Sequence, residues 1–180
     1  MANVNDFVNR LSGGGARANQ FKVTVSGGFM GGAASSAMTF LCRTSALPAM
    51  TVGEVPIPYR GRTVYVAGDR TYADWTVTVF NDNDWLVRGA LESWSSGINN
   101  IGSSTAGAQP PNSYYGEGQV QQLDRSENVI RTATLHGLWP TNVAEIALAY
   151  ETNDVIEEFD CTFRFNYMTL AGEGGALGAG

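Results

Sequence analysis

The side chains that could carry out catalysis are few, and they are not grouped. His136 is the only histidine of the chain and lies in a stretch that alternates like a strand. A histidine that acts as a general base normally has a partner that orients it, and the sequence offers none. The motifs G-x-S-x-G and H-E-x-x-H and the phosphate-binding glycine loop are absent as well. We therefore interpret His136 as a structural side chain and expect no enzymatic activity.

Acidic residues are clustered at two places, and each cluster has a structural interpretation. Asp82 and Asp84 stand in an Asn-Asp-Asn-Asp run that lacks the glycine and the distant glutamate of an EF-hand loop. Their oxygens suit the N-terminal cap of a helix instead. Glu157 and Glu158 are adjacent just before a strand, so they point to opposite faces and make a poor acid/base pair.

The two cysteines, Cys42 and Cys161, do not form a C-x-x-C pair, and one histidine cannot complete a zinc site with them. We expect both to be reduced, small apolar side chains in a cytoplasmic product. We expect neither a metal nor another cofactor. The N-terminus has no apolar signal-peptide core, and no stretch approaches ~18 uninterrupted apolar residues, so neither a leader nor a membrane span is expected.

Charge and composition limit the function classes further. The chain has 180 residues, the size of one domain, with 11 Lys and Arg against 17 Asp and Glu, a formal charge of −6. Proteins that grip nucleic acid need clustered cations, so the aromatic residues, including Tyr114 and Tyr115, are not expected to stack on bases. A hydrophobic content of 43% is enough for a core and excludes a disordered chain.

Strands must position most of these residues. Alternating apolar and polar residues predict strands over residues 21–26, 38–43, 74–80, 119–124, 128–138 and 159–167. In the clearest of them, Trp75, Val77 and Val79 share one face, and Thr76 and Thr78 share the other.

Proline marks a different kind of element. Pro56 and Pro58 cannot donate hydrogen bonds to a strand ladder, so residues 46–61 are predicted to be an edge strand or a projecting extended loop. Residues 62–66 could be its returning strand, and residues 68–70 are interpreted as a turn.

One helix is predicted, over about residues 82–98, because Val87, Leu91, Trp94 and Ile98 recur at helical spacing. Two long segments are interpreted as loops: the glycine-rich residues 27–34 and the polar residues 100–118, which carry Tyr114 and Tyr115.

The predicted fold class is α+β, mainly β: a β-sandwich or barrel of about seven to eight mostly antiparallel strands with one flanking helix and extended loops or arms. Residues 1–20 are predicted to be an N-terminal arm with a short helical piece and a glycine joint, residues 21–170 the β domain, and residues 171–180 a glycine-rich tail.

Three stretches resemble one known family. Residues 66–82 read VAGDRTYADWTVTVFND, residues 137–145 read GLWPTNVAE, and residues 42–48 read CRTSALP. In this order and around the same helix, they resemble the tail tube proteins of contractile-tailed bacteriophages, which are related to the tube proteins of type VI secretion systems. The resemblance spans about residues 18–168 and makes the β domain a tail-tube β-barrel domain. The departures lie at residues 27–34, at residues 100–118 and in the C-terminal tail.

The resemblance implies a structural protein that forms hexameric rings, and the rings stack into a hollow tube inside a contractile sheath, the conduit for genome ejection. The implied partners are further copies of the chain, the sheath protein, the baseplate or tube initiator, the tail terminator and the tape-measure protein. Double-stranded DNA would pass through without tight binding. The implied location is the virion tail, after assembly in the host cytoplasm.

Candidate residues follow from this resemblance. Candidates for contacts between subunits are Asp69, Arg70, Pro56, Tyr59, Arg60, Tyr114, Tyr115 and Trp139. For Asp69 and Arg70 the alternatives are a surface ion pair in a turn and a salt bridge at a ring or stacking interface. A polar strand face, directed to the lumen or to the outside, comprises Thr76, Thr78, Asp160 and Arg164.

The acidic charge would also have a role in such a tube. Six copies at −6 each would carry −36 per ring, and a like-charged wall would keep DNA from adhering within a Debye length of ~8 Å. We expect neighbouring subunits to order the glycine-rich ends and the long loops.

Two other functions stay open on the sequence. The chain could be the inner-tube subunit of a phage-derived bacteriocin or of a type VI-like contractile injection system, whose channel carries no genome. A monomeric β-sandwich binding module is the third possibility, and it predicts single molecules with mobile ends in place of rings.

Overall fold

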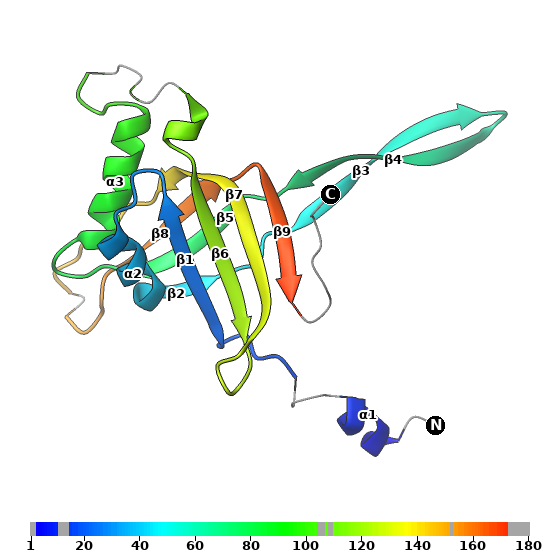
Figure 1. Ribbon diagram of the computed structural model, residues 1–180, viewed down its shortest axis with the longest axis horizontal. Helices are drawn as coiled ribbons and strands as arrows, with labels where there is room; N and C mark the ends of the chain where they lie inside the picture. The colour runs from blue at the N-terminus through cyan, green and yellow to red at the C-terminus, as the bar shows by residue number, and fades with distance from the viewer. Residues whose placement is uncertain (1–2, 11–14, 104–106, 108–109, 152, 173–180) are drawn as a thin grey trace.

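The computed structural model describes residues 3–10, 15–103, 107, 110–151 and 153–172, and this part is mainly β-structure (Figure 1). Its helices are α1 (Val4–Arg10), α2 (Gly32–Leu41), α3 (Leu86–Ile98) and the short 3₁₀ turn η2 (Pro111–Ser113). Its strands are β1 (Phe21–Gly27), β2 (Cys42–Ser45), β3 (Met50–Tyr59), β4 (Arg62–Tyr72), β5 (Trp75–Phe80), β6 (Gly116–Leu123), β7 (Val129–Val143), β8 (Glu158–Arg164) and β9 (Tyr167–Gly172).

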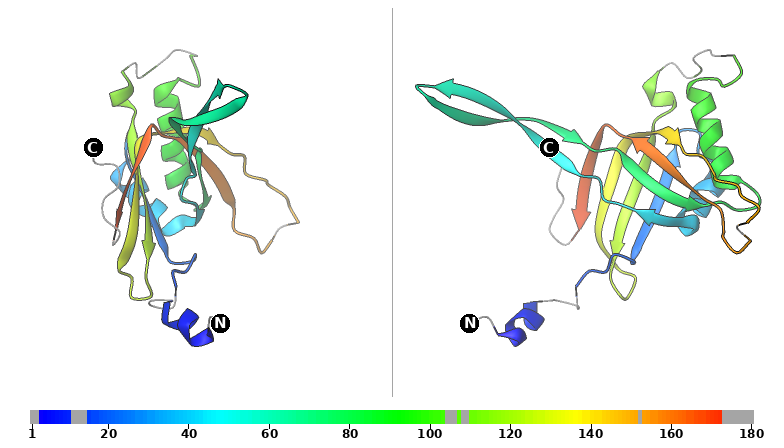
Figure 2. Two further views of the ribbon diagram at one scale, coloured as in Figure 1. Left: turned by 90° about the vertical axis from the view of Figure 1, so that its right-hand side faces the viewer. Right: turned by 180° about the vertical axis from the view of Figure 1, so that it is seen from behind.

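One antiparallel sheet follows the order β1-β6-β7-β8-β5-β2, and β9 pairs with β7 outside this path. The long strand β7 joins two layers, because residues 131–136 pair with β9 and residues 139–143 pair with β8. Layer A therefore contains β1, β6, the first part of β7, and β9, and layer B contains the end of β7, β8, β5 and β2 (Figures 1 and 2). This confirms a mainly β, antiparallel fold, but within the described part of one chain the sheet does not close into a barrel.

Gly137 is the point at which β7 changes layers. Its φ of +68° lies in the left-handed region that favours glycine. Between β8 and β9, the backbone N–H of Asn166 donates to the His136 carbonyl oxygen at 2.9 Å. The predicted single strand over residues 159–167 is therefore wrong in its extent: it divides around residues 165–166 into β8, which stays in layer B, and β9, which enters layer A.

The core lies between the layers, as the alternation predicted. Layer B contributes Trp75, Val77 and Phe163, and layer A contributes Val23 and Leu135, all at most 1% exposed. Helices α2 and α3 pack against each other and close one end of this core with Met38, Leu91 and Trp94.

Helix α2 corrects two predictions, the glycine-rich loop over residues 27–34 and the strand over residues 38–43. The helix buries Ala34 and Met38, which are four residues apart, against β1 and α3. This spacing places both on one helical face, so packing outweighed the short alternation that suggested a strand. Of the predicted strand, only residues 42–43 belong to β2.

Helix α3 begins at Leu86, four residues later than the predicted 82–98, and buries Val87, Leu91 and Trp94. Trp85 is its N-cap, with a left-handed φ of +52°. The Asp82 carboxylate accepts the backbone N–H of Asp84 at 2.7 Å. Asp82 thus stabilises a local turn ahead of the helix and does not cap it, which corrects that prediction.

Strands β3 and β4 form a separate two-stranded hairpin that projects from the sheet (Figures 1 and 2). The excursion predicted from Pro56 and Pro58 and its returning strand are confirmed. The predicted turn at residues 68–70 is wrong, because β4 continues through it to Tyr72. The hairpin turns at Arg60 and Gly61, which have φ of +47° and +80°.

Parts of three predicted segments lie outside the described residues: 1–2 and 11–14 of the arm, 104–106 and 108–109 of the polar loop, and 173–180 of the tail. The described end of the polar loop forms η2 and the first residues of β6. Among the described residues, no helix combines the length and the apolar character that crossing a membrane requires.

Candidate assembly surfaces

The hairpin carries an aliphatic face that nothing in the described part of the chain covers. Val55 pairs with Val66 and Ile57 with Val64, so the four side chains share one face of the ribbon. Each is 47–52% exposed. A two-stranded hairpin is marginally stable in water alone, and a contiguous apolar patch on a surface marks an interaction site. We call these four residues the hairpin face.

Three predicted contact residues, Pro56, Tyr59 and Arg60, lie together near the tip of this hairpin. The guanidinium of Arg60 lies over the Tyr59 ring at 5.5 Å from its centroid, and the Tyr59 side chain is 62% exposed. Arg62 faces Tyr59 across the ribbon. The tip therefore combines aromatic and cationic groups, which suit a partly acidic partner surface.

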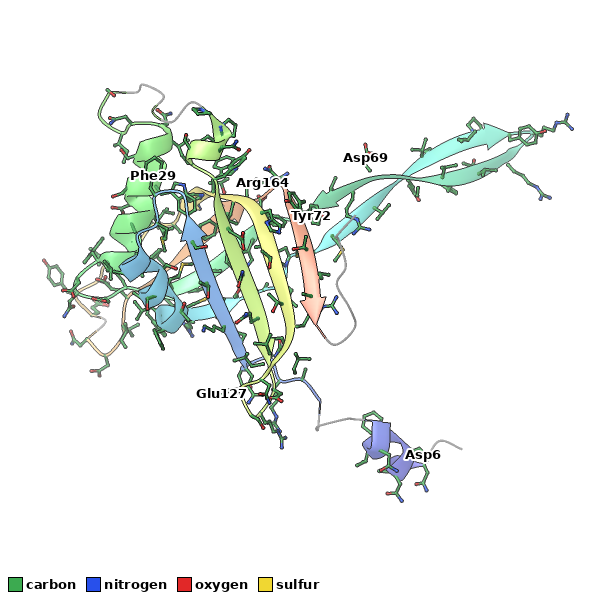
Figure 3. The ribbon with its side chains drawn as sticks, viewed as in Figure 1. Asp6, Phe29, Asp69, Tyr72, Glu127 and Arg164 are labelled. Carbon is green, nitrogen blue, oxygen red and sulfur yellow. The ribbon has the colours of Figure 1, made fainter. Side chains whose placement is uncertain are left out.

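Asp69 and Arg70 lie nearer the base of the hairpin, in β4, where Figure 3 labels Asp69. Neither forms an ion pair within the described part of the chain. The Arg70 guanidinium contacts the Met50 sulfur at 3.7 Å instead. The interpretation as an ion pair within a turn is therefore wrong, and the interface salt bridge stays a prediction.

The remaining predicted contact residues, Tyr114, Tyr115 and Trp139, form a half-buried aromatic cluster. The Tyr114 ring lies edge-on to both others, with centroids 5.0 Å from Tyr115 and 6.5 Å from Trp139. The indole N–H of Trp94 donates to the Tyr114 carbonyl oxygen at 2.8 Å. This hydrogen bond fixes the end of the loop on α3, so the cluster has a structural role within one chain.

The predicted polar strand face exists on the outer side of layer B. The Thr78 hydroxyl donates to the Asp160 carboxylate at 2.7 Å, and Thr76 and Thr162 share a hydrogen bond of 3.1 Å. At one end of the face the Arg164 guanidinium binds the Asp74 carboxylate at 2.5 Å. The structure thus brings Thr76, Thr78, Asp160 and Arg164 onto one surface.

A second polar face, on the outer side of layer A, was not singled out by sequence reasoning. Facing residues across its strands form three rows: Lys22–Gln121–Thr132, Thr24–Gln119–Thr134–Thr169 and Ser26–Glu117–His136–Tyr167. The alternation in β1, β6 and β7 indicated which residues are polar. Only the pairing of the four strands shows that they form one continuous surface.

His136 belongs to this second face, where its contacts are structural. Its Nε2 lies 3.0 Å from the Thr169 hydroxyl, and its ring stacks on Tyr167 at 4.6 Å between centroids. The Glu117 carboxylate lies 3.7 Å from Nδ1. Within the described residues, no three histidine, cysteine or acidic side chains are grouped as metal ligands would be.

Comparison with known proteins identifies the family. Residues 12–170 match the family described as phage tail tube protein. The chain belongs to this family. The tail tube protein gp19 of Enterobacteria phage T4 is 37% identical over 157 residues, which cover 87% of this chain and 92% of that protein. The tail tube protein of Serratia phage KSP90 is 32% identical over 171 residues, which cover 92% and 95%. As a tail tube protein, the chain is a component of the virion tail.

The fold of this tail tube protein recurs in other contractile machines. The solved sheath/tube terminator structure of an extracellular contractile injection system, PVC, includes a chain with a TM-score of 0.64 and 10% identity to this one. The match covers 87% of the tail tube protein and 96% of that chain. At this identity the likeness is one of fold.

Proposed function

We propose that the tail tube protein acts by assembly alone. Six copies form a ring, the rings stack into a hollow tube inside a contractile sheath, and the genome leaves through the tube. The observation that carries the proposal is the combination, in layer A, of two open strand edges with a continuous polar face.

The ring closes through strands β1 and β9. Each is an edge of layer A, so each has a row of backbone N–H and C=O groups that no other described strand pairs. Such edges promote uncontrolled association unless they are covered. The two strands have seven and six residues. Pairing β1 of one copy with β9 of the next satisfies both edges and, repeated around a circle, leaves no edge of layer A open.

The polar face of layer A then lines the channel. Layer B has one open edge, at β2, because its other side continues into β7, so it cannot close a ring by itself. The side chains of the three rows are mostly amides and hydroxyls, and Lys22 balances Glu117. The wall proposed here therefore has balanced charge, in place of the acidic wall expected from the net charge, and it gives the phosphates of DNA little to bind. The face of Thr76, Thr78, Asp160 and Arg164 is directed outward in this arrangement.

The hairpin makes the contact between successive rings. It projects beyond the sheet, and its aliphatic face is half-exposed in the single chain. Burial of that face against another copy would stabilise the stack and, with it, the hairpin itself. Pro56, Tyr59, Arg60, Asp69 and Arg70 all lie on this element. Tyr114, Tyr115 and Trp139 are proposed to touch a neighbour with their exposed edges.

The proposed partners are the sheath protein, the baseplate or tube initiator, the tail terminator, the tape-measure protein and, in transit, double-stranded DNA. The solved sheath/tube terminator structure includes a chain that resembles this one in fold, and this resemblance supports the proposed contact with the sheath protein. An inner tube of an injection system that carries no genome is the second candidate function. The identity to tail tube proteins of phages favours the genome conduit.

Electron microscopy of the purified full chain, with and without its tail initiator complex, tests the proposal. We expect rings with a central hole, and stacked tubes when the initiator is present. Single globular particles in both preparations would overturn it.

A further inference from the structure

A second exposed apolar surface lies on the loop between β7 and β8, residues 144–157. Leu148, Tyr150, Val155 and Ile156 are between 66% and 104% exposed. The residues around them enclose a hollow of about 410 Å³, lined by Ala147, Leu148, Ala149, Tyr150, Val155 and Glu157. We call the four exposed side chains and this hollow the loop seat. Large apolar side chains exposed together on a surface indicate a docking site.

The base of this loop is held firmly, so the seat has a fixed position on the molecule. The Arg88 guanidinium of α3 donates to the Ala144 carbonyl oxygen at 2.9 Å. At the other end, the backbone N–H of Asn81 donates to the Glu157 carbonyl oxygen at 2.8 Å, and the Asn81 amide donates to the Glu157 carboxylate at 3.0 Å.

Charge distinguishes the loop seat from the hairpin. Residues 144–157 contain four acids and no lysine or arginine; the acids are Glu145, Glu151, Asp154 and Glu157. The outer part of the hairpin, residues 55–66, contains Arg60 and Arg62 and no acid. Each surface therefore pairs an exposed apolar area with charges of one sign, and the two signs are opposite. Such complementarity selects a partner and fixes its register.

The two surfaces also leave layer B at opposite ends. The hairpin ends at Tyr72, just before Trp75 starts β5, whereas the loop ends just before Glu158, which pairs with Phe80 at the end of β5. The right-hand view of Figure 2 shows the hairpin and the loop at opposite ends of layer B. A protein with complementary surfaces at its two ends binds head to tail, and such contacts either close into a ring or extend into a stack. The contact around the ring is already assigned to β1 and β9, so we assign this second pair of surfaces to the stack.

We propose that the loop seat receives the hairpin of a second copy in the next ring. The hairpin face covers the exposed apolar side chains of the seat, and Arg60 and Arg62 lie against the acids Glu151 and Asp154. This inference rests on the proposed stacking of rings and names the receiving surface. This one contact removes both apolar areas from water. Because it joins two different surfaces, every ring in the stack faces the same way.

Cross-linking in assembled tubes tests the contact directly. Thr63→Cys and Asn153→Cys place thiols beside the hairpin tip and the seat and leave the apolar and charged residues unchanged. Burial raises the pKa of the native Cys42 thiol to about 11 and also raises the pKa of the buried Cys161, so the native thiols react slowly near neutral pH. Tubes of the double variant are treated with a short bismaleimide and separated under denaturing conditions.

We expect a ladder of covalent products that extends beyond six copies in the double variant and no ladder in either single variant. A ladder that stops at six copies places the contact within one ring and overturns the inference. Intact tubes without a ladder overturn it as well, while the proposed tube function stands. Failure of the unmodified chain to form rings or tubes with its initiator overturns both.

Charge exchange provides an independent measurement. The pair Arg60→Glu with Arg62→Glu, and the pair Glu151→Arg with Asp154→Arg, are each expected to lower the yield of sedimented tubes by about tenfold. The four changes together should restore most of it. Arg125→Glu, an exposed charge in the turn between β6 and β7, is the matched control and should leave the yield unchanged. No recovery in the combined variant would overturn the pairing of these two surfaces.

Discussion

Gly137 lies directly against Asn166: a Cβ atom on this glycine would fall 2.3 Å from the Asn166 amide nitrogen. The contact lies where β7 leaves layer A for layer B and where the chain passes from β8 to β9. Both layers depend on it, because each uses a different part of β7. The close approach and the left-handed φ together require glycine at this point.

Replacing Gly137 with alanine should therefore destabilise the chain by about 1–3 kcal/mol, since the new Cβ meets Asn166 in a backbone conformation that disfavours it. Urea unfolding measures the change. Gly89→Ala is the matched control: it lies in α3 with open space around it, and alanine there should stabilise the helix by up to ~1 kcal/mol. Equal effects of the two substitutions would contradict this account of the strand.

The turn between β6 and β7 gives a prediction about pH. Hydrogen bonds from the Asn128 side chain and backbone, and from the Ser126 backbone, lower the pKa of Asp124 below its ordinary 3.8. A carboxylate with a lowered pKa in the folded state stabilises the fold above pH 3.8, and this contribution is lost as the pH falls through the lowered value.

Asp124→Asn should accordingly be less stable than the unmodified chain at pH 7, and the difference should shrink in thermal unfolding as the pH falls below 3.8. Ser126→Ala keeps the backbone donor and should behave like the unmodified chain at both pH values. A difference that persists unchanged at low pH would show that the charge of Asp124 has no part in it.

The hairpin face allows folding and assembly to be separated. Ile57→Asp places a charge on a side chain that is 47% exposed in the single chain, so unfolding stability should change by no more than about 0.5 kcal/mol. Tube formation should be lost, because the charge would be buried between copies. Val129→Asp is the matched control, because Val129 is 48% exposed and begins β7, outside the hairpin, and tubes are expected in sedimentation and microscopy. Normal tubes with Ile57→Asp would exclude this face from the contact.

The channel face gives a prediction about DNA. Gln119→Arg adds one cation per copy to the middle row of layer A, and in assembled tubes these arginines should retain duplex DNA in a salt-dependent manner. Thr76→Arg adds the same charge to the outer face of layer B and is the control. DNA retention by the Thr76 variant alone, measured by co-sedimentation after nuclease treatment, would place the channel on layer B.

Strands β5 and β8 of layer B could be predicted from the sequence because their residues alternate without exception. Trp75, Val77 and Val79 face the core and Thr76 and Thr78 face outward, as expected. The hairpin was predictable for a different reason: Pro56 and Pro58 exclude a central strand, whereas an edge ribbon tolerates them.

The errors arose where a short pattern fits two structures. In α2 the buried pair Ala34 and Met38 is separated by one helical turn, but the glycines before it and the brief alternation after it suggested a loop and a strand. Only contacts with β1 and α3 decide between these possibilities. The three polar rows depend on which strands are neighbours in layer A. The loop seat depends on which side chains of residues 144–157 lie together at the end of layer B. A single sequence contains neither kind of information.

The central claim is that β1 of one copy pairs with β9 of the next, so that layer A forms the wall of a closed channel. Cryo-electron microscopy of assembled tubes at a resolution that separates strands measures this directly. We predict a continuous sheet across every subunit boundary, with Thr24, Gln119 and Thr134 facing the hole. Subunits joined through α2 and α3, or a hole lined by Thr76 and Thr78, would contradict the account.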